Sequence, residues 1–172
     1  MKTENVFSIC VVDDDDLFLK SLKHFLQDKW QDKIKIKLFH SGEEFLRYIS
    51  EHKTDIVILD YVLNSFYPFA MDGHSVLQKI KQTDSDMKVI MLSGQDKIEI
   101  ALKSIQNGAF DYVIKNDITF LKIQTSIKKA IESIASLKQK QLERKWIVIA
   151  MVSALIVAAT VILTQLFSPV FN

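Results

Sequence analysis

The sequence predicts a doubly wound α/β fold, in which helices cover both faces of a five-stranded parallel sheet, followed by one C-terminal transmembrane helix. Strand-like apolar runs alternate with helix-like runs, and two of the strand-like runs are almost entirely apolar. Alternating strands and helices form parallel sheets with right-handed crossovers, and strands buried on both faces appear as continuous apolar runs. A final segment without charged residues predicts the transmembrane helix.

The five strands are predicted from the pattern of apolar residues. Residues 33–39, KIKIKLF, alternate between polar and apolar, as expected of a half-exposed strand. Residues 55–60 (DIVILD) and 87–94 (MKVIMLSG) are apolar runs that predict strands covered on both faces. The first and the last strand are expected at 6–12 and 110–116.

Helical segments separate these strands, and a further helix follows the last strand. Residues 15–30 predict a helix, with apolar side chains at helical spacing: Leu17, Phe18, Leu22, Phe25 and Leu26. Residues 41–52 open with Ser41 and Glu44 at the spacing of a capping box, which marks a helix N-terminus. The remaining helices are expected at 73–82, at 97–107 and from about Asp117 towards the C-terminus.

Charge divides the chain into an acidic body, a basic segment and an uncharged tail. Residues 118–145 carry seven Lys or Arg and two Glu, a net charge of +5. The formal net charge of the whole chain is +1, so residues 1–117 carry a net charge of −4. The one cysteine, Cys10, cannot form a disulfide within the chain, and its strand-like surroundings predict a buried apolar role.

The uncharged tail predicts a membrane anchor. Residues 146–167 contain no charged residue, no Pro and no Gly. As a helix they would be about 33 Å long, enough to cross a hydrocarbon core of about 30 Å. The preceding residues 138–145 carry four Lys or Arg, whereas residues 168–172 carry no charged side chain. Because positive flanks stay in the cytoplasm, we expect a single-pass protein of the inner or plasma membrane with its body in the cytoplasm.

Polar side chains stand at the ends of four predicted strands. Asp13 and Asp14 follow the first strand. Asp60 ends the third strand, Ser93 the fourth and Lys115 the fifth. In open α/β sheets the ligand crevice lies at the carboxyl ends of the strands. Each residue alone has an ordinary structural explanation, but together they predict that three carboxylates, a hydroxyl and an ammonium converge on one site.

On these residues the chain resembles the receiver domain of two-component response regulators. The similarity covers about residues 5–128 and rests on VVDDDD, DIVILDYVL, MDGHSVLQKIK, VIMLSG and ALKSIQNGAFDYVIK, in that order. It implies a flavodoxin-like, CheY-like sheet with the strand order 2-1-3-4-5. We therefore expect a receiver domain at 1–128, a basic helical neck at 129–145, a transmembrane helix at 146–167 and a short extracytoplasmic tail at 168–172.

The chemistry of these residue types agrees with the resemblance. A carboxylate can attack a phosphoryl group to form an acyl phosphate, and Asp60 is the expected phosphoacceptor. Because an anion then attacks an anion, the reaction needs compensating positive charge. Mg²⁺ suits carboxylate ligands, here Asp13, Asp14 and Asp60, and Lys115 is expected to bind the phosphoryl oxygens. The resemblance adds the backbone carbonyl of Val62 as a metal ligand.

The resemblance also implies a conformational switch. The hydroxyl of Ser93 would donate a hydrogen bond to the phosphoryl oxygens and move towards them. Tyr112, an aromatic residue three positions before the lysine, would turn inward at the same time. The other acids of the run, Asp15 and Asp16, are expected to begin the next helix, whose dipole favours negative charge.

Two departures from the family pattern stand out. Asn116 follows the lysine, where the family usually has a proline. A cis bond before a residue other than proline would cost about 3 kcal/mol, so we expect this turn to be either trans or strained. The segment 61–71 is longer than the usual loop. Its aromatic residues Phe66, Tyr67 and Phe69 either form a docking surface or fold back onto the domain.

The predicted function is that of a membrane-tethered, single-domain response regulator rather than an enzyme. Its phosphoryl donor would be a histidine kinase or a histidine phosphotransfer protein, and its output would be protein contact, without a DNA-binding domain or a nucleic-acid partner. One alternative is a haloacid-dehalogenase-like, Mg²⁺-dependent phosphatase that uses Asp13 and Asp15, which would leave Asp60 without a role. The other is a degenerate receiver, or phosphate sink, that acts only as an interaction module.

The last helix also predicts a homodimer. Six apolar residues and then Gln141 recur there at alternating steps of three and four, the spacing of a coiled coil. The positions are Phe120, Ile123, Ile127, Ala130, Ile134, Leu137 and Gln141. Within the apolar tail Ala150, Ala154 and Ala158 form a small-residue face that lets helices approach closely. Together these patterns predict parallel self-association through one continuous helix.

Overall fold

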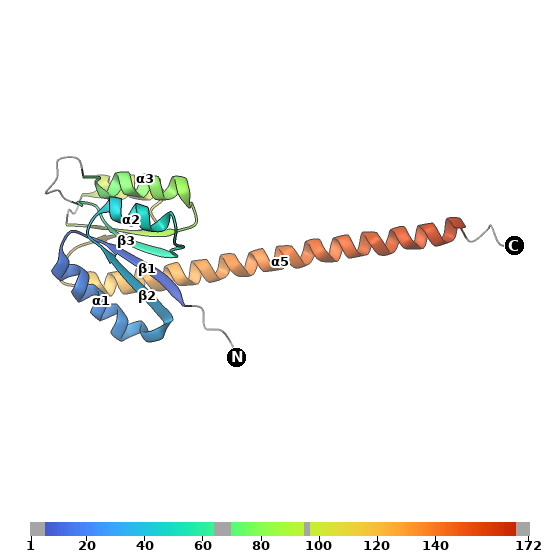
Figure 1. Cartoon of the computed structure of the whole chain (residues 1–172), viewed down its shortest axis with the longest axis horizontal. Helices are drawn as coiled ribbons and strands as arrows, with labels where there is room; N and C mark the ends of the chain where they lie inside the picture. The colour runs from blue at the N-terminus through green and yellow to red at the C-terminus, as the bar shows by residue number, and fades with distance from the viewer. Residues whose placement is uncertain (1–5, 64–69, 95–96, 168–172) are drawn as a thin grey trace. The chain divides into compact units, whose positions relative to one another are not determined.

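The computed structural model describes residues 6–63, 70–94 and 97–167. The chain forms two compact units, Met1–Ile131 and Glu132–Asn172. The first contains a five-stranded sheet with the order β2-β1-β3-β4-β5, in which all neighbouring strands are parallel (Figure 1). The strands are β1 (Phe7–Val12), β2 (Ile34–Phe39), β3 (Ile56–Asp60), β4 (Lys88–Ser93) and β5 (Asp111–Ile114). The sheet confirms the predicted parallel α/β fold and its strand order 2-1-3-4-5.

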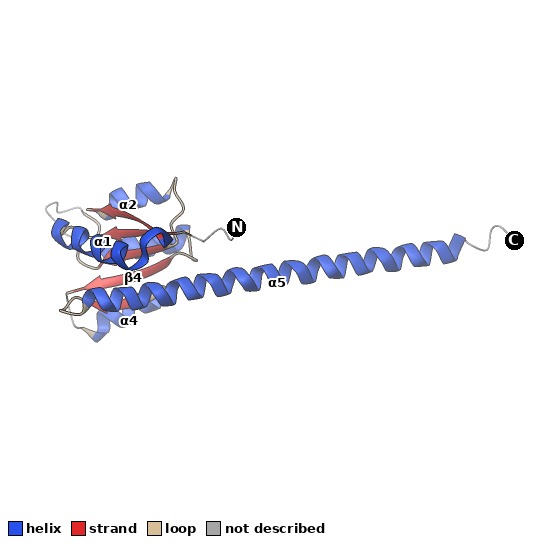
Figure 2. Ribbon diagram, turned by 90° about the horizontal axis from the view of Figure 1, so that it is seen from below, coloured by secondary structure: helices blue, strands red, loops and turns tan. Residues whose placement is uncertain are grey.

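Helices follow the strands in the predicted alternation (Figure 2). They are α1 (Asp16–Trp30), α2 (Gly42–Ile49), α3 (Gly73–Thr83), α4 (Ile98–Gln106) and α5 (Thr119–Phe167). Half of the capping box predicted for α2 is present: the Ser41 side chain accepts a hydrogen bond from the Glu44 amide, whereas the Glu44 carboxylate accepts one from the His40 amide. A short 3-10 turn, Gln31–Lys33, joins α1 to β2 and was not predicted. The aromatic residues Phe66, Tyr67 and Phe69 lie outside the described residues.

Apolar side chains cover both faces of the sheet, as expected where successive strand residues point to opposite sides. On one face the strands pack against α2 and α3, and Figure 1 shows these two helices together on that side. The strand residues of this layer are Cys10, Val12, Val57, Leu59, Val89 and Met91. The alternate strand residues, among them Ile9, Val11 and Ile58, are also fully buried. They belong to the face that α1 covers.

The first turn of α1 confirms where the helix was predicted to begin, but one residue of the predicted apolar face of α1 is exposed. Asp15 is the N-cap, and its carboxylate accepts hydrogen bonds from the amides of Leu17 and Phe18. Asp16 is the first helical residue, so both acids begin the helix as predicted. Leu17, however, is 75% exposed although it belongs to the apolar pattern. The face that packs on the sheet carries Leu22 and Leu26, which belong to that pattern, and also Leu19, and all three are fully buried.

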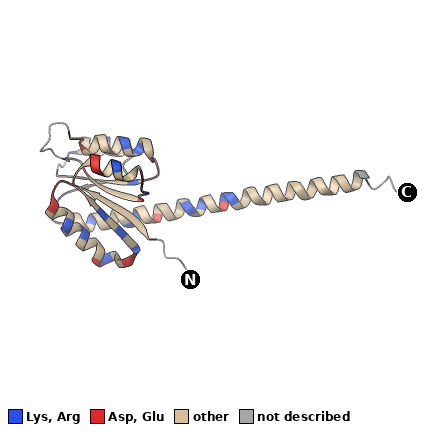
Figure 3. Ribbon diagram, in the orientation of Figure 1, with Lys and Arg blue, Asp and Glu red and all other residues tan. Residues whose placement is uncertain are grey.

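The helix α5 contributes to both units. In the first unit Ile123, Ile127 and Ala130 are fully buried, as expected for a helix that covers the sheet. In the second unit the side chains from Ala135 to Gln165 are exposed. By length and composition, this is the one helix among the described residues that is able to cross a membrane. Figure 3 shows Lys and Arg along the helix before the apolar stretch and none within that stretch.

Candidate functional site

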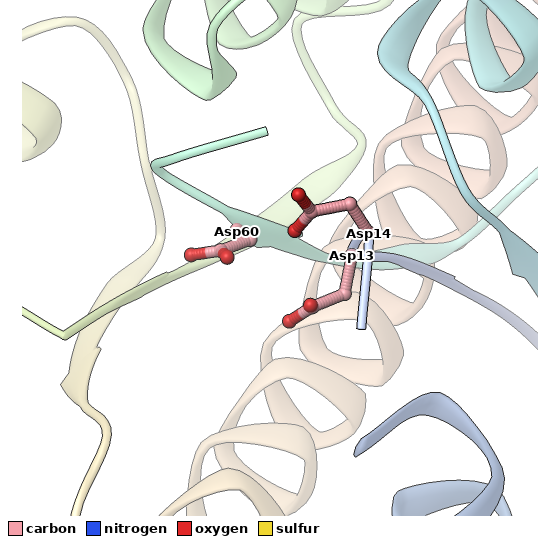
Figure 4. A group of neighbouring side chains, drawn as sticks. All are labelled: Asp13, Asp14 and Asp60. Atoms are coloured by element: carbon pink, nitrogen blue, oxygen red, sulfur yellow. The ribbon is translucent and has the colours of Figure 1, made fainter. Parts of the chain in front are cut away.

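Three carboxylates gather at the carboxyl ends of two central strands (Figure 4). Val12 pairs with Leu59 in the parallel β1–β3 ladder, so the residues that follow them, Asp13 and Asp60, lie side by side. With Asp14, these residues each offer a carboxylate oxygen, and the three oxygens lie within 4.8 Å of one another. Asp13 and Asp60 are buried, whereas Asp14 is exposed. The cluster therefore has a buried floor and an opening to solvent.

Lys115 supplies positive charge to the two buried carboxylates. Its Nζ donates hydrogen bonds to Asp13 Oδ2 at 2.7 Å and to Asp60 Oδ2 at 2.8 Å. The register explains its position, since Ser93 pairs with Ile114 and the Lys115 amide donates to the Ser93 carbonyl oxygen at 2.8 Å. Ser93 is fully buried at the end of β4. The structure thus brings the five residues selected from the sequence to one edge of the sheet.

Burial and charge act in opposite directions on the ionisable groups of this cluster. Burial raises the pKa of Asp13 and of Asp60, and the hydrogen bonds and positive charge of Lys115 offset that rise only in part. Burial lowers the pKa of Lys115, but the hydrogen bonds that it donates to both carboxylates, together with their negative charge, more than offset this effect, and the pKa lies above its usual value. Two buried acids therefore share one ammonium, which leaves an excess of negative charge that a divalent cation fits.

Glycine at position 73 allows α3 to begin directly against the end of β3. A Cβ atom at Gly73 would lie 2.0 Å from the backbone oxygen of Asp60, so no larger residue fits without a shift of the backbone. The Gly73 amide donates to the Tyr61 carbonyl oxygen at 3.0 Å. The Val62 amide lies 3.4 Å from Asp60 Oδ1 and donates to it. The positioning role of Gly73 was not predicted, although Gly73 belongs to the motif MDGHSVLQKIK on which the resemblance rests.

Asn116 forms a polar turn between β5 and α5. The described residues contain no cis peptide bond, so the bond after Lys115 is trans. The Asn116 amide donates to Thr119 Oγ1 at 2.5 Å, and the Asn116 side-chain oxygen accepts from the Ile118 amide at 3.2 Å. Of the two expected outcomes the trans form is found. The amide that proline would lack is used to hold the first turn of α5.

Tyr112 and its neighbour connect the edge strand β5 to the rest of the domain. Tyr112 is half-buried and packs against the apolar cluster of the sheet. Asp111 accepts a hydrogen bond from the buried Ser126 hydroxyl in α5, with Oδ2 and Oγ 2.6 Å apart. This contact between β5 and α5 was not predicted, because only the fold places position 126 opposite position 111. The role of Tyr112 as a switch residue stays a prediction.

An aromatic cluster adjoins the lysine. The Lys115 Nζ atom lies over the Phe18 ring, 4.7 Å from its centroid. Phe18 meets Phe120 edge to face at 5.6 Å, and Phe25 packs against Phe120 at 5.5 Å. These rings line a groove between α1 and the start of α5 whose volume is about 500 Å³. The sequence pattern assigned Phe18 and Phe25 only to an apolar helix face.

The comparison with known families decides what this arrangement is. Residues 9–128 match the family model of the response regulator receiver domain. The chain belongs to this family. The acidic triad of Asp13, Asp14 and Asp60 is typical of the receiver Mg²⁺ site. Receiver domains are signalling modules that partner with histidine kinases, which favours this reading over a haloacid-dehalogenase-like phosphatase.

Curated relatives share the receiver and extend well beyond it. The transcriptional regulatory protein ZraR of Escherichia coli is 29% identical over 129 residues, which are 75% of this chain and 27% of ZraR. A putative NtrX-like response regulator of Rickettsia bellii is 30% identical over 144 residues, 82% of this chain and 28% of its own length. The chain therefore spans less than a third of the length of either relative.

Solved receiver structures have the same fold. A receiver domain protein of Clostridium thermocellum superposes with a TM-score of 0.66 at 28% identity, over 77% of this chain and 99% of that one. The BeF3-activated DrrB receiver domain superposes with a TM-score of 0.61 at 29% identity, over 74% of this chain and 98% of that one. Both comparisons agree with the five-stranded sheet described above.

Proposed function

We propose that this chain is a membrane-tethered response regulator that accepts a phosphoryl group on Asp60. The observation that carries the proposal is the contact of one ammonium, that of Lys115, with the carboxylates of both Asp13 and Asp60. Asp60 lies at the end of a central strand, and Asp14 opens the cluster to solvent. A buried acid with a paired lysine and a neighbouring acidic pair has the parts that phosphoryl transfer to a carboxylate needs.

In the proposed reaction a carboxylate oxygen of Asp60 attacks the phosphorus of a phosphohistidine. The P–O bond forms as the P–N bond breaks, and the leaving imidazole keeps the electron pair and takes up a proton. Mg²⁺, held by Asp13, Asp14, Asp60 and the Val62 carbonyl, would supply positive charge at the phosphoryl oxygens. Lys115 exchanges part of its contact with Asp60 for a contact with a phosphoryl oxygen.

Ser93 and Tyr112 carry the proposed change of conformation. The Ser93 hydroxyl donates a hydrogen bond to a phosphoryl oxygen and moves towards Asp60. That movement makes room for the half-buried ring of Tyr112, which then turns inward. Support for this sequence of events comes from the positions of the two residues, since Ser93 ends β4 and Tyr112 lies on the adjacent strand β5.

We further propose that residues 146–167 cross the inner or plasma membrane once. The proposed parts are a receiver at 1–128, a basic neck at 129–145, this transmembrane helix and an extracytoplasmic tail at 168–172. Support comes from the exposed apolar stretch of α5 and from the basic residues that precede it. The full chain is expected in the membrane fraction, resistant to high salt and alkaline extraction. Recovery in the soluble fraction after alkaline extraction would contradict the tether.

The proposed partners follow from the receiver domain and from helix α5. Receiver domains partner with histidine kinases, so a histidine kinase or a phosphotransfer protein is the proposed donor. The output is proposed to be a protein contact close to the membrane. Self-association through α5 is also proposed, because the coiled-coil spacing reaches Leu137, which is 43% exposed in the second unit.

The decisive experiment is the mapping of the modified residue. The full-length chain in detergent is incubated with Mg²⁺ and acetyl phosphate, and the acyl phosphate is located by mass spectrometry after borohydride reduction. The expected adduct is on Asp60, and Asp60→Asn is expected to abolish it while keeping the circular dichroism spectrum. Turnover of phosphate esters through Asp13 would support a phosphatase instead. The absence of both adduct and turnover would support an interaction module.

A further inference from the structure

We infer that Phe18 is a positioning residue for Lys115, and that it holds the ammonium where the phosphoryl group of Asp60 will form. The inference rests on the proposed phosphoryl transfer to Asp60. It concerns a side chain on α1, outside the five polar residues of the site. The juxtaposition of the Phe18 ring and the Lys115 ammonium carries it, and that juxtaposition arises from segments almost a hundred residues apart in the chain.

The contact has the geometry of a cation–π interaction. Lys115 Nζ lies 4.7 Å from the centroid of the Phe18 ring, within the range of about 6 Å over which the ring attracts a cation. The same ammonium donates to Asp13 at 2.7 Å and to Asp60 at 2.8 Å. Three partners thus define the position of Nζ. Two of them are acids that change their ligands during the reaction, whereas the ring does not.

Phe18 is itself held in place by the beginning of α5. Its ring meets the Phe120 ring edge to face at 5.6 Å, with 71° between the ring planes. This is one of the arrangements that aromatic pairs prefer. Phe120 follows Thr119, the first residue of α5, whose hydroxyl bonds to Asn116 next to the lysine. The ring over Lys115 is therefore anchored to the turn that carries Lys115.

Positioning of this kind matters because lysine has a long and flexible side chain. Fixing such a side chain in one geometry costs conformational entropy. Because the Phe18 ring already holds the ammonium before the reaction, this cost does not fall on the phosphorylation step. When Asp60 bears a phosphoryl group, its carboxylate can no longer offer the same oxygen to the ammonium. The ring of Phe18 then keeps Nζ beside the new phosphoryl oxygens instead of letting it turn to solvent, which reaches 25% of the lysine side chain.

The test measures the affinity of the full-length chain in detergent for beryllofluoride in the presence of Mg²⁺. We expect Phe18→Leu to weaken binding about two- to fivefold, the range that a partly exposed cation–π contact implies. Phe18→Tyr keeps the ring face and is expected to bind like the wild type. Phe25→Leu is the matched control, because Phe25 lines the same groove and packs on Phe120 at 5.5 Å. It is expected to change the affinity less than Phe18→Leu.

A double-mutant cycle separates positioning from a general structural effect. In a Lys115→Met background, Phe18→Leu is expected to have no further effect on beryllofluoride affinity, because the ring no longer has an ammonium to hold. An equal loss in both backgrounds, or an equal loss from Phe25→Leu, would overturn the inference. Wild-type affinity in Phe18→Leu would overturn it as well. If Phe18→Leu does not fold, Phe18→Met takes its place in the cycle.

The proposed function and this inference fail in different ways. A wild-type chain that does not bind beryllofluoride with Mg²⁺ would contradict phosphoryl transfer to Asp60, and with it the inference. A wild-type chain that binds, together with a Phe18→Leu variant that binds equally well, would contradict the role of Phe18 alone.

Discussion

Asp13 and Asp60 are buried carboxylates that share a single lysine, and each also accepts one backbone hydrogen bond, from the Asp15 amide and the Val62 amide respectively. Removing a carboxylate from water is costly unless nearby charges or hydrogen bonds replace the solvent. Lys115 contacts both acids, but the pKa of each acid is still raised, with burial as the largest cause. The unliganded domain therefore holds negative charge at the expense of its stability, and that charge is available for a cation.

The first prediction concerns pH and the stability of the domain. Because the pKa of Asp60 is raised above 3.8 by folding, its contribution to stability is full below pH 3.8 and is lost as the pH rises through the folded-state pKa. At pH 7, without Mg²⁺, we expect Asp60→Asn to unfold at a higher temperature than the wild type. The difference should shrink as the pH falls towards 4. Calorimetry of both proteins at each pH measures it.

The exposed Asp28 on α1 supplies the control for this prediction. Asp28→Asn removes the same charge from the chain without touching the buried cluster, so the unfolding temperature should stay close to that of the wild type across the pH range. An Asp60→Asn variant that is less stable than the wild type at pH 7 would show that the loss of the lysine contact outweighs the relief of burial.

The second prediction concerns the close approach at Gly73. Gly73→Ala would place a Cβ atom 2.0 Å from the Asp60 backbone oxygen, so the end of β3 or the start of α3 has to move. We expect a lower unfolding temperature and slower phosphorylation by acetyl phosphate. Gly94→Ala is the stability control, since a Cβ atom there meets nothing within 4 Å. Equal unfolding temperatures for the two variants would contradict the steric argument.

At the scale of elements, Asp111 and Ser126 join β5 to α5. Ser126 is buried, and its hydroxyl donates to Asp111 across 2.6 Å. We predict that Ser126→Ala destabilises the domain by about 1 kcal/mol, because Asp111 loses a partner in a half-buried place. Urea unfolding followed by circular dichroism measures the change. Thr125→Ala is the neighbouring control, since the Thr125 hydroxyl is exposed and bonds only within its own helix, to the Leu121 carbonyl.

The elements themselves were largely predictable from local patterns. The apolar run before Asp60 predicts a central strand because a strand buried on both faces has no polar alternation, and β3 is buried throughout. Leu17 is exposed because, at about 100° per residue, it lies on the opposite side of α1 from the fully buried Leu19, Leu22 and Leu26. Apolar character alone placed it in the pattern, and its angular position on the helix shows that it faces away from the sheet.

The candidate site was predictable in its residues but not in its contacts. Strand-end positions identify Asp13, Asp60 and Lys115, because parallel strands end at the same edge. The sharing of one ammonium by two acids, and the ring of Phe18 above it, depend on side-chain conformations that no local pattern encodes. The bond between Asp111 and Ser126 was not predicted because only the packing of α5 on β5 brings these two positions together.

At the scale of the whole chain, the last prediction concerns self-association through α5. Cysteine at position 137, in a Cys10→Ser background, is expected to cross-link between chains in membranes more readily than cysteine at position 140. Leu137 continues the coiled-coil spacing, whereas Lys140 lies off it. The native Cys10 is buried and its thiol pKa is raised to about 11, chiefly by burial, so it contributes little reactivity. Equally low cross-linking at both positions would contradict self-association through α5.

The lysines of β2 hinder edge-to-edge pairing between copies of the chain. This strand forms one edge of the sheet, and an uncovered edge presents free backbone groups to which another chain can add a strand. Lys35 and Lys37 are exposed along it, and their charges repel an identical edge. On the membrane surface to which we propose that the chain is tethered, copies would meet far more often than in solution. The charged edge would then guard against sheet-to-sheet aggregation.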